Sequence, residues 1–161
     1  MILSSAGEAL PPLMKGPPKG QSGRGLVNTG ALEGARILVV EDEPQVQDFV
    51  SRVLQLEGAT VVTASTGSEA LARMEDAGPF RVVTLDLCLP DISGWEVLEA
   101  IRLIPASAAA CAVVVLSAGP GEEIARRSAA MGAGYLAKPT AARALVERLA
   151  SFIEGCPSAG E

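Results

Sequence analysis

The sequence predicts an α/β domain in which five parallel strands alternate with five helices. Short apolar runs rich in Val, Leu and Ile alternate along the chain with segments whose apolar residues recur at helical spacing. The chain has 161 residues, 48% of them hydrophobic and 20% charged, which is enough to bury the core of one domain with an appended tail. Alternating strands and helices favour parallel strands joined by right-handed crossovers.

The first strand is predicted over residues 36–41, RILVVE, because a nearly continuous apolar run is typical of a strand covered by helices on both faces. A helix follows, with Pro44 suited to its first position. Its pattern ends at Gly58, and its apolar residues recur at helical spacing: Val46, Phe49, Val50, Val53 and Leu54. The second strand is predicted over residues 60–64.

A capping-box motif predicts the start of each of the next two helices. Thr66 with Glu69, and Ser93 with Glu96, have the spacing at which a hydroxyl caps the helix while the carboxylate reaches back. The third strand, over residues 80–86, lies between these two helices. Both helices therefore have a start that is visible in the sequence.

The last part of the chain continues the alternation. A fourth strand is predicted over residues 111–117, a more polar helix over 122–131 and a short fifth strand over 134–138. Thr140 is expected to cap the final helix, whose apolar residues are Leu145, Leu149, Phe152 and Ile153.

The composition of the first 34 residues differs from that of the rest of the chain. Residues 1–34 hold 7 of the 17 glycines and 4 of the 11 prolines, with no aromatic residue, so a flexible extension is expected. The stretch at 11–20, PPLMKGPPKG, alternatively resembles a polyproline-type partner motif. The folded domain is expected over residues 35–154, with a short tail at 155–161.

Composition and charge exclude several classes of function. The net charge of −6 and the 3% aromatic content argue against nucleic-acid binding. The absence of histidine excludes Ser/His/Asp and Cys/His catalysis and the usual zinc sites. Three widely spaced cysteines without a C-x-x-C pair favour a reducing, cytoplasmic location. No signal peptide and no apolar run of membrane-spanning length is present, so no membrane association is expected.

Polar residues gather at one edge of the predicted sheet. In a parallel α/β sheet, ligands bind outside the carboxyl ends of the strands. Each of these residues has an ordinary explanation as a helix start or a surface charge, but five at one edge indicate a site. Those that follow or end the first, third, fourth and fifth strands are Glu41, Asp42, Asp86, Ser117 and Lys138.

Three converging carboxylates repel one another unless a cation is present. Mg2+ is the natural candidate, with Asp42 and Asp86 as ligands, Glu41 acting through water and the backbone carbonyl of Cys88 as a further oxygen. With Lys138 also neutralising a phosphoryl donor, the Asp86 carboxylate can attack phosphorus and form an acyl phosphate. The hydroxyl of Ser117 would then donate to the new phosphoryl group.

Four sequence blocks occur in a characteristic order and spacing: ILVVEDEP at 37–44, VVTLDLCLPDISGWEVL at 82–98, VVVLSA at 113–118 and GYLAKP at 134–139. In these blocks the chain from about residue 36 to residue 153 resembles the receiver domain of two-component response regulators, in particular single-domain regulators of the chemotaxis type. This resemblance implies a flavodoxin-like (βα)5 fold with strand order 2-1-3-4-5.

The resemblance also implies a role for each site residue. Glu41 and Asp42 would be the acidic pair, Asp86 would be the phosphoacceptor, and the backbone carbonyl of Cys88 would bind the metal. Ser117 would be the switch hydroxyl, Tyr135 would be the switch aromatic residue, and Lys138 would pair with the phosphoryl group. The peptide bond between Lys138 and Pro139 would be cis. The sequence departs slightly from the family pattern, with Glu41 where aspartate is commoner and Ser117 where threonine is commoner. Trp95 is expected to pack its helix close to the site.

The implied function is phosphorelay signalling. Asp86 would accept a phosphoryl group from a histidine kinase or a histidine phosphotransfer protein, and the domain would signal through a downstream protein target, as a monomer or a phosphorylation-dependent dimer.

One alternative function is that of an aspartate-nucleophile phosphatase, which uses Mg2+ in the same way. Its D-x-D motif requires a second aspartate, and this chain has cysteine at that position, residue 88. Another is an interaction module independent of phosphorylation. A DNA-binding output is not expected, because only seven residues follow Glu154 and residues 1–34 show no helix-turn-helix pattern.

Overall fold

The computed structural model describes residues 30–104, 111–119, 121–138 and 140–154. All five strands lie parallel in one sheet in the order β2-β1-β3-β4-β5, which confirms the predicted fold. The strands are β1 (Arg36–Val40), β2 (Thr60–Ala64), β3 (Val82–Asp86), β4 (Ala112–Ser117) and β5 (Gly134–Ala137). The helices in the described residues are α1 (Pro44–Leu56), α2 (Gly67–Asp76), α3 (Gly94–Leu103), α5 (Gly121–Ala130) and α6 (Ala142–Glu154).

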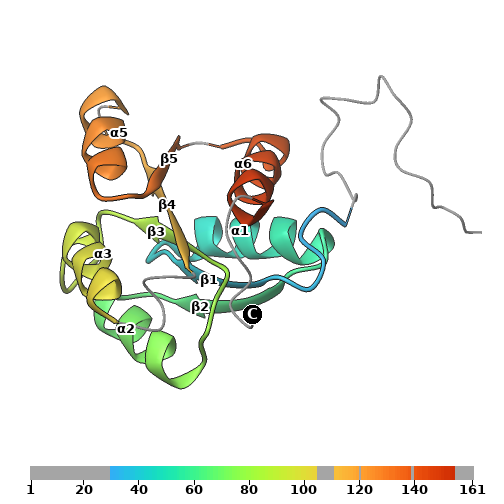
Figure 1. Ribbon diagram of the computed structural model, residues 1–161, viewed down its shortest axis with the longest axis horizontal. Coiled ribbons are helices and arrows are strands. Elements are labelled where there is room, and N and C mark those ends of the chain that lie inside the picture. The colour runs from blue at the N-terminus through green and yellow to red at the C-terminus, as the bar shows by residue number, and fades with distance from the viewer. Residues whose placement is uncertain (1–29, 105–110, 120, 139, 155–161) are drawn as a thin grey trace, which may run out of the picture.

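Helices cover both faces of the sheet (Figure 1). On one face Leu38 and Val40 of β1 join a core packed by α2, α3 and α5. On the other face Ile37 and Val39, their immediate neighbours, join a core packed by α1 and α6. Successive residues of a strand point to opposite faces, so a strand buried on both sides must be apolar at every position. The continuous apolar run in the first strand has this cause.

The strand register brings the carboxyl ends of β1 and β3 together. Val40, the last residue of β1, pairs with Leu85, and Asp86 ends β3 one residue later. Glu41 and Asp42 follow β1 directly. The sheet therefore presents three acidic residues at the edge where the sequence places a site.

The two predicted capping boxes begin α2 and α3. Thr66 Oγ1 accepts a hydrogen bond from Glu69 N at 3.0 Å, and Ser93 Oγ accepts one from Glu96 N at 3.3 Å. In the first box the carboxylate of Glu69 reaches back one residue beyond the cap, to Ser65 N at 2.8 Å. These local signals correctly marked both helix starts.

The folded part of the chain begins earlier than composition indicated. Leu32 is buried against the sheet face covered by α1 and α6, and its N–H donates to the Glu57 carbonyl at 3.0 Å. Gly34 N donates to the Gly58 carbonyl at 3.1 Å. Residues 30–34 thus pack at the C-terminal end of α1, although the prediction had placed them in the flexible extension.

Two other local expectations have different outcomes. Helix α6 begins at Ala142, and the Thr140 hydroxyl donates to the Ala137 carbonyl at 2.6 Å, so in place of capping the helix it closes the turn after β5. The predicted cis bond between Lys138 and Pro139 lies outside the described residues. Among the described residues, the peptide bond between Gly78 and Pro79 is cis.

Candidate functional site

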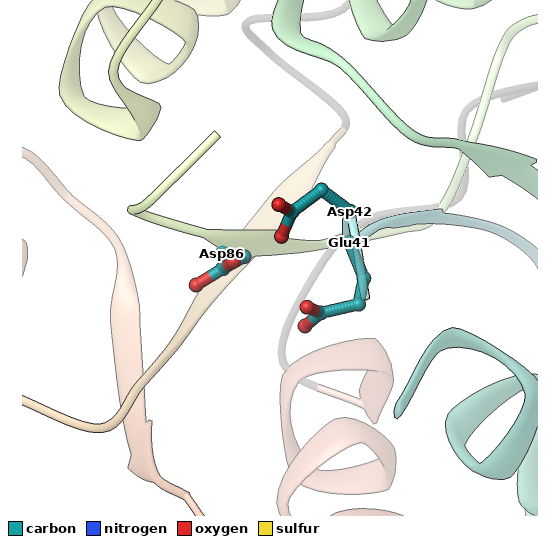
Figure 2. A group of neighbouring side chains, drawn as sticks. All are labelled: Glu41, Asp42 and Asp86. Atoms are coloured by element: carbon teal, nitrogen blue, oxygen red, sulfur yellow. The ribbon is translucent and has the colours of Figure 1, made fainter. Parts of the chain in front are cut away.

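Three carboxylates meet at the carboxyl ends of β1 and β3. One oxygen from each of Glu41, Asp42 and Asp86 lies within 4.8 Å of the others. Figure 2 shows the three side chains close together at this edge of the sheet. Glu41 and Asp86 are buried, whereas Asp42 is exposed. Carboxylate oxygens are the hard ligands that Mg2+ prefers, so these residues suit that ion.

Lys138 joins two of these carboxylates. Its Nζ lies 2.7 Å from Glu41 Oε1 and 3.3 Å from Asp86 Oδ1, and its side chain is only 19% exposed. The backbone supports this placement, because Lys138 N donates to the Ser117 carbonyl at 2.9 Å, which extends the pairing of β5 with β4. The buried carboxylates and the lysine thus form one ion-paired cluster.

Burial governs the protonation of this cluster. It raises the pKa of the Glu41 carboxyl, although the hydrogen bond from Lys138 acts in the opposite direction. It also raises the pKa of Asp86, against the lowering effect of the Lys138 charge. For Lys138, burial lowers the pKa, but the hydrogen bond to Glu41 and the charge of Asp86 outweigh it, and the pKa is raised. The lysine is therefore a firmly charged cation beside two carboxyls that hold their protons more readily than usual.

Ser117 lies at the end of β4, at the wall of the same pocket. The side chain is buried, and its Oγ accepts a hydrogen bond from Gly119 N at 3.2 Å. The pocket has a volume of about 540 Å³, and its lining includes Glu41, Asp42, Asp86, Cys88, Trp95, Ser117, Ile124 and Lys138. Of the predicted site residues that the structure describes, all except Tyr135 therefore line this pocket.

Tyr135 lies beside α5, outside the lining of the acidic pocket. Its side chain packs against the core beneath α2, α3 and α5, and its hydroxyl is buried without a hydrogen-bond partner among the described residues. A Cβ added at Gly121 would lie 3.2 Å from that hydroxyl, so glycine makes room for the ring at the start of α5. The tyrosine ring thus packs against the start of α5.

The loop after Asp86 is held at three points. Cys88 donates its N–H to the Asp86 carboxylate, and Gly94 N donates to the Leu87 carbonyl at 3.0 Å. A Cβ at Gly94 would lie 2.5 Å from the Asp86 carbonyl oxygen, which explains the glycine before α3. Between these points the two carboxylate oxygens of Asp91 accept hydrogen bonds from Gly67 N and from Ser68 N, both at 2.8 Å.

Sequence reasoning missed the contacts of two residues near the site. Asp91 was not singled out, yet it fixes the loop to the start of α2 across 24 residues of sequence. Trp95 lines the pocket, as its position near the site indicated, but its ring also lies under the Arg127 guanidinium, 4.2 Å from the ring centroid. This cation–π contact links α3 to α5 above the acidic cluster.

The sequence profile of the response regulator receiver domain matches residues 37–150, most of the chain. The chain belongs to this family. Among curated relatives, the transcriptional regulatory protein TcrA of Mycobacterium tuberculosis is 45% identical over 73 residues, which are 45% of this chain and 28% of TcrA. The probable regulator TcrX of the same organism is 37% identical over 120 residues, 73% of this chain and 49% of TcrX. The chain thus spans half or less of the length of these relatives.

Solved receiver domains have the same fold. The chemotaxis response regulator CheY4 of Vibrio cholerae is 30% identical with a TM-score of 0.68, and the match covers 73% of this chain and 98% of CheY4. The response regulator TrrA of Thermotoga maritima, solved in complex with Mg2+ and BeF, is 31% identical with a TM-score of 0.63 and the same coverage.

Membership in the family settles the general function. Receiver domains are signalling modules of two-component systems, not classical enzymes, and interact with a histidine kinase or a phosphotransfer protein. They generally bind Mg2+ at an acidic pocket, and Glu41, Asp42 and Asp86 form such a pocket here. No helix in the part of the chain that the structure describes is long and apolar enough to cross a membrane.

Proposed function

We propose that this receiver domain is phosphorylated on Asp86 by a partner histidine kinase or histidine phosphotransfer protein. The observation that carries the proposal is the ion-paired cluster at the ends of β1 and β3, in which Asp86 lies 3.3 Å from Lys138 and within a pocket open to solvent. Asp86 interacts with every charged member of this cluster, because it shares Lys138 with Glu41 and because the charge of Asp42 contributes to the raised pKa of Asp86.

In the transfer, an Asp86 carboxylate oxygen forms a bond to phosphorus as the phosphorus–nitrogen bond of a phosphohistidine breaks, and the electron pair of that bond stays with the imidazole nitrogen. Lys138 pairs with the negative oxygens of the phosphoryl group, and the Ser117 hydroxyl donates a hydrogen bond to one of them. Asp42, Asp86 and the Cys88 carbonyl would hold Mg2+, with Glu41 acting through water, and the ion would supply charge neutralisation at this site.

The added negative charge then acts on the elements around the pocket. A phosphoryl group brings close to two negative charges and strong hydrogen-bond acceptors. Ser117 and Lys138 move toward it, and Tyr135 follows because it packs beside α5. The output surface is the face formed by α5, β5 and α6, where a downstream protein target binds or a second copy joins a phosphorylation-dependent dimer. The proposed function does not involve binding to nucleic acid, and we place the protein in the cytoplasm.

The proposal is tested by intact-protein mass after incubation with Mg2+ and a small acyl-phosphate donor. The native chain should gain one phosphoryl group, and Asp86→Asn should gain none. Asp76→Asn is the matched control, because Asp76 is an exposed aspartate at the end of α2, away from the pocket, and it should gain the group as the native chain does.

Two further measurements, phosphate release from a generic ester and binding of a beryllofluoride mimic, separate the alternatives. Sustained release of phosphate from a generic ester, with turnover far above one per chain, would favour the phosphatase and overturn the signalling role. No mass gain, together with failure to bind a beryllofluoride mimic, would favour an interaction module independent of phosphorylation. The Thermotoga relative was solved with Mg2+ and BeF, which makes this mimic the appropriate probe.

A further inference from the structure

An apolar groove lies between α1 and α6, next to the acidic pocket. It has a volume of about 500 Å³ and is lined mainly by apolar side chains, including Val46, Phe49, Leu116 and Leu145. Phe49 is 41% exposed, which is unusual for an aromatic side chain in a domain with so few of them. Lys138 and Ala118 line both the groove and the acidic pocket, so the two hollows share a wall.

The groove continues along α1 toward its C-terminal end. A second hollow is lined by Phe49, Arg52, Val53, Gln55 and Leu56, and Leu56 is 44% exposed. Val46, Phe49, Val53 and Leu56 are three or four residues apart, so they form one apolar stripe on the helix. Phe49 and Leu56 leave parts of this stripe exposed to solvent, although Val53 between them is buried. Exposed apolar side chains of this kind are a surface that another apolar segment can cover.

The chain itself enters the fold at the end of this stripe. Leu32 and Gly34 are hydrogen-bonded to the carbonyls of Glu57 and Gly58, directly after α1. The 29 residues that precede Gly30 in the sequence are therefore attached beside Leu56, at one end of the apolar stripe.

Those residues have a composition that matches the groove. Residues 9–14, ALPPLM, are an uncharged apolar stretch. Residues 1–29 carry Lys15, Lys19 and Arg24 against Glu8 alone, a formal charge of +2, whereas the rest of the chain is strongly acidic. The N-terminal half of α1 is flanked by exposed carboxylates, which are those of Asp42, Glu43 and Asp48.

The tether has a suitable length. Fifteen residues lie between Met14 and Gly30, and the segment from Met14 to Gly30 spans about 22 Å as a flexible coil and up to about 55 Å when extended. Helix α1, with 13 residues, is about 20 Å long. A tether whose coil length matches the span gives a local concentration in the millimolar range, which a second copy or a separate partner reaches only at high concentration.

We propose that residues 9–14 dock in the groove between α1 and α6 of the same molecule. Leu10, Leu13 and Met14 supply the apolar side chains, and the prolines reduce the conformational entropy that docking removes. The docked segment lies against the wall that the groove shares with the acidic pocket. This proposal holds whether or not Asp86 is phosphorylated, so its test does not depend on the proposed function.

The test is hydroxyl-radical labelling of Phe49 in the full chain, read by mass spectrometry. Labelling should be about threefold slower in the native chain than in the variant Leu10→Asp/Leu13→Asp/Met14→Asp. This difference is expected when the local concentration of the tethered segment and its dissociation constant for the groove are both in the millimolar range. Leu103, which is 81% exposed on α3, serves as the internal reference and should label equally in both.

A matched control carries the same added charge with the apolar stretch intact. The variant Ser4→Asp/Ser5→Asp/Ser22→Asp should keep the slow labelling of Phe49. Equal labelling of Phe49 in the native chain and the first variant would overturn the proposal, as would loss of protection in the control. Protection that increases with protein concentration would show that a second copy covers the groove, and would also overturn it.

Discussion

Lys138 is the residue on which the electrostatics of the site depend. Its Nζ is the cation that the structure places within ion-pair distance of both Glu41 and Asp86. Removing one partner of a buried ion pair is strongly destabilising, because the remaining charges lie in a poorly solvated place without compensation. The stability of the metal-free domain should therefore depend on this side chain.

We predict that Lys138→Met lowers the free energy of unfolding by about 3 kcal/mol in EDTA at pH 7, the lower end of the usual range because the lysine is partly exposed. Mg2+ should restore more stability to this variant than to the native chain, because the ion supplies the missing positive charge. Urea unfolding with and without Mg2+ measures both effects. Lys138→Arg, which keeps the charge, should lose less, and a Met variant as stable as the native chain would contradict the account.

Sequence predicted which residues form the cluster but not how they pair. Parallel strand ends meet at one edge, so the positions of Glu41, Asp86 and Lys138 in the sheet follow from the strand pattern. The 2.7 Å contact of Lys138 with Glu41 depends on side-chain length and on the register of β5 against β4, neither of which the sequence reveals. The side chain of Glu41 is one methylene longer than that of aspartate, and its Oε1 contacts Lys138.

At the level of elements, Asp91 ties the loop that follows β3 to helix α2. Its carboxylate accepts hydrogen bonds from the first two N–H groups of the helix. A hydrogen bond from the Ser68 side chain, together with these backbone bonds, lowers the pKa of Asp91 well below the usual range. Ile92 packs so closely on Gly67 that a Cβ there would collide with it. The loop that carries Cys88 is therefore positioned by the start of α2, which packs on the same face of the sheet as α3.

We predict that Asp91→Ala weakens Mg2+ binding on the order of tenfold, as loss of an outer residue that orients a metal site does. Thr66→Ala is the matched control, because it removes another cap of the same helix, at about 1 kcal/mol of stability, without touching the loop. Its Mg2+ affinity should remain native. Titration of the fluorescence of Trp95, the only tryptophan and part of the pocket wall, measures both affinities. Equal affinities in the two variants would show that Asp91 has no positioning role.

The lowered pKa of Asp91 also predicts a pH dependence. A carboxyl whose pKa is lower in the folded state stabilises the fold fully above its unfolded pKa of about 3.9, and this stabilisation is lost as pH falls through the folded-state pKa. The stability difference between the native chain and Asp91→Asn should thus be constant from pH 7 to about pH 5 and shrink below about pH 4. Thermal unfolding across this range measures it, and a difference that grows on acidification would contradict the sign.

The capping residues also show which features of an element the sequence discloses. Thr66 and Ser93 cap through partners three residues away, so their spacing is readable in one segment. Asp91 caps α2 from another loop, and only the folded chain brings the two together. The same limit applies to Leu32, which composition places outside the domain. Leu32 is one apolar residue in a glycine-rich segment, and only the folded chain shows that it is buried against α1 and the sheet.

For the whole molecule, the central feature is a sheet buried equally on two faces. Ile37 and Leu38 are adjacent and both fully buried, yet they belong to different cores. We predict that Ile37→Ala and Leu38→Ala each lower the free energy of unfolding by about 2 to 5 kcal/mol. Urea unfolding tests this, and a near-neutral effect of either substitution would mean that one face is not a true core. Arg52→Ala on the exposed side of α1 should change stability by less than about 1 kcal/mol.

This two-sided burial also explains why the fold was the most predictable property. Strands apolar at every position require helices on both faces, and the alternation with helices then leaves few topologies. The groove beside α1 was not predictable in this way, because Val46 and Phe49 read as ordinary core positions of an amphipathic helix. Only the packing of α6 shows that they remain partly open.

The central claim is that Asp86, among three neighbouring carboxylates, receives the phosphoryl group. The most direct measurement is reduction of the phosphorylated chain with borohydride, which converts an acyl phosphate to an alcohol, followed by peptide mapping. The account predicts reduction at Asp86 alone, in the peptide that contains residues 82–98. Reduction at Glu41 or Asp42, or in a peptide outside the pocket, would contradict it.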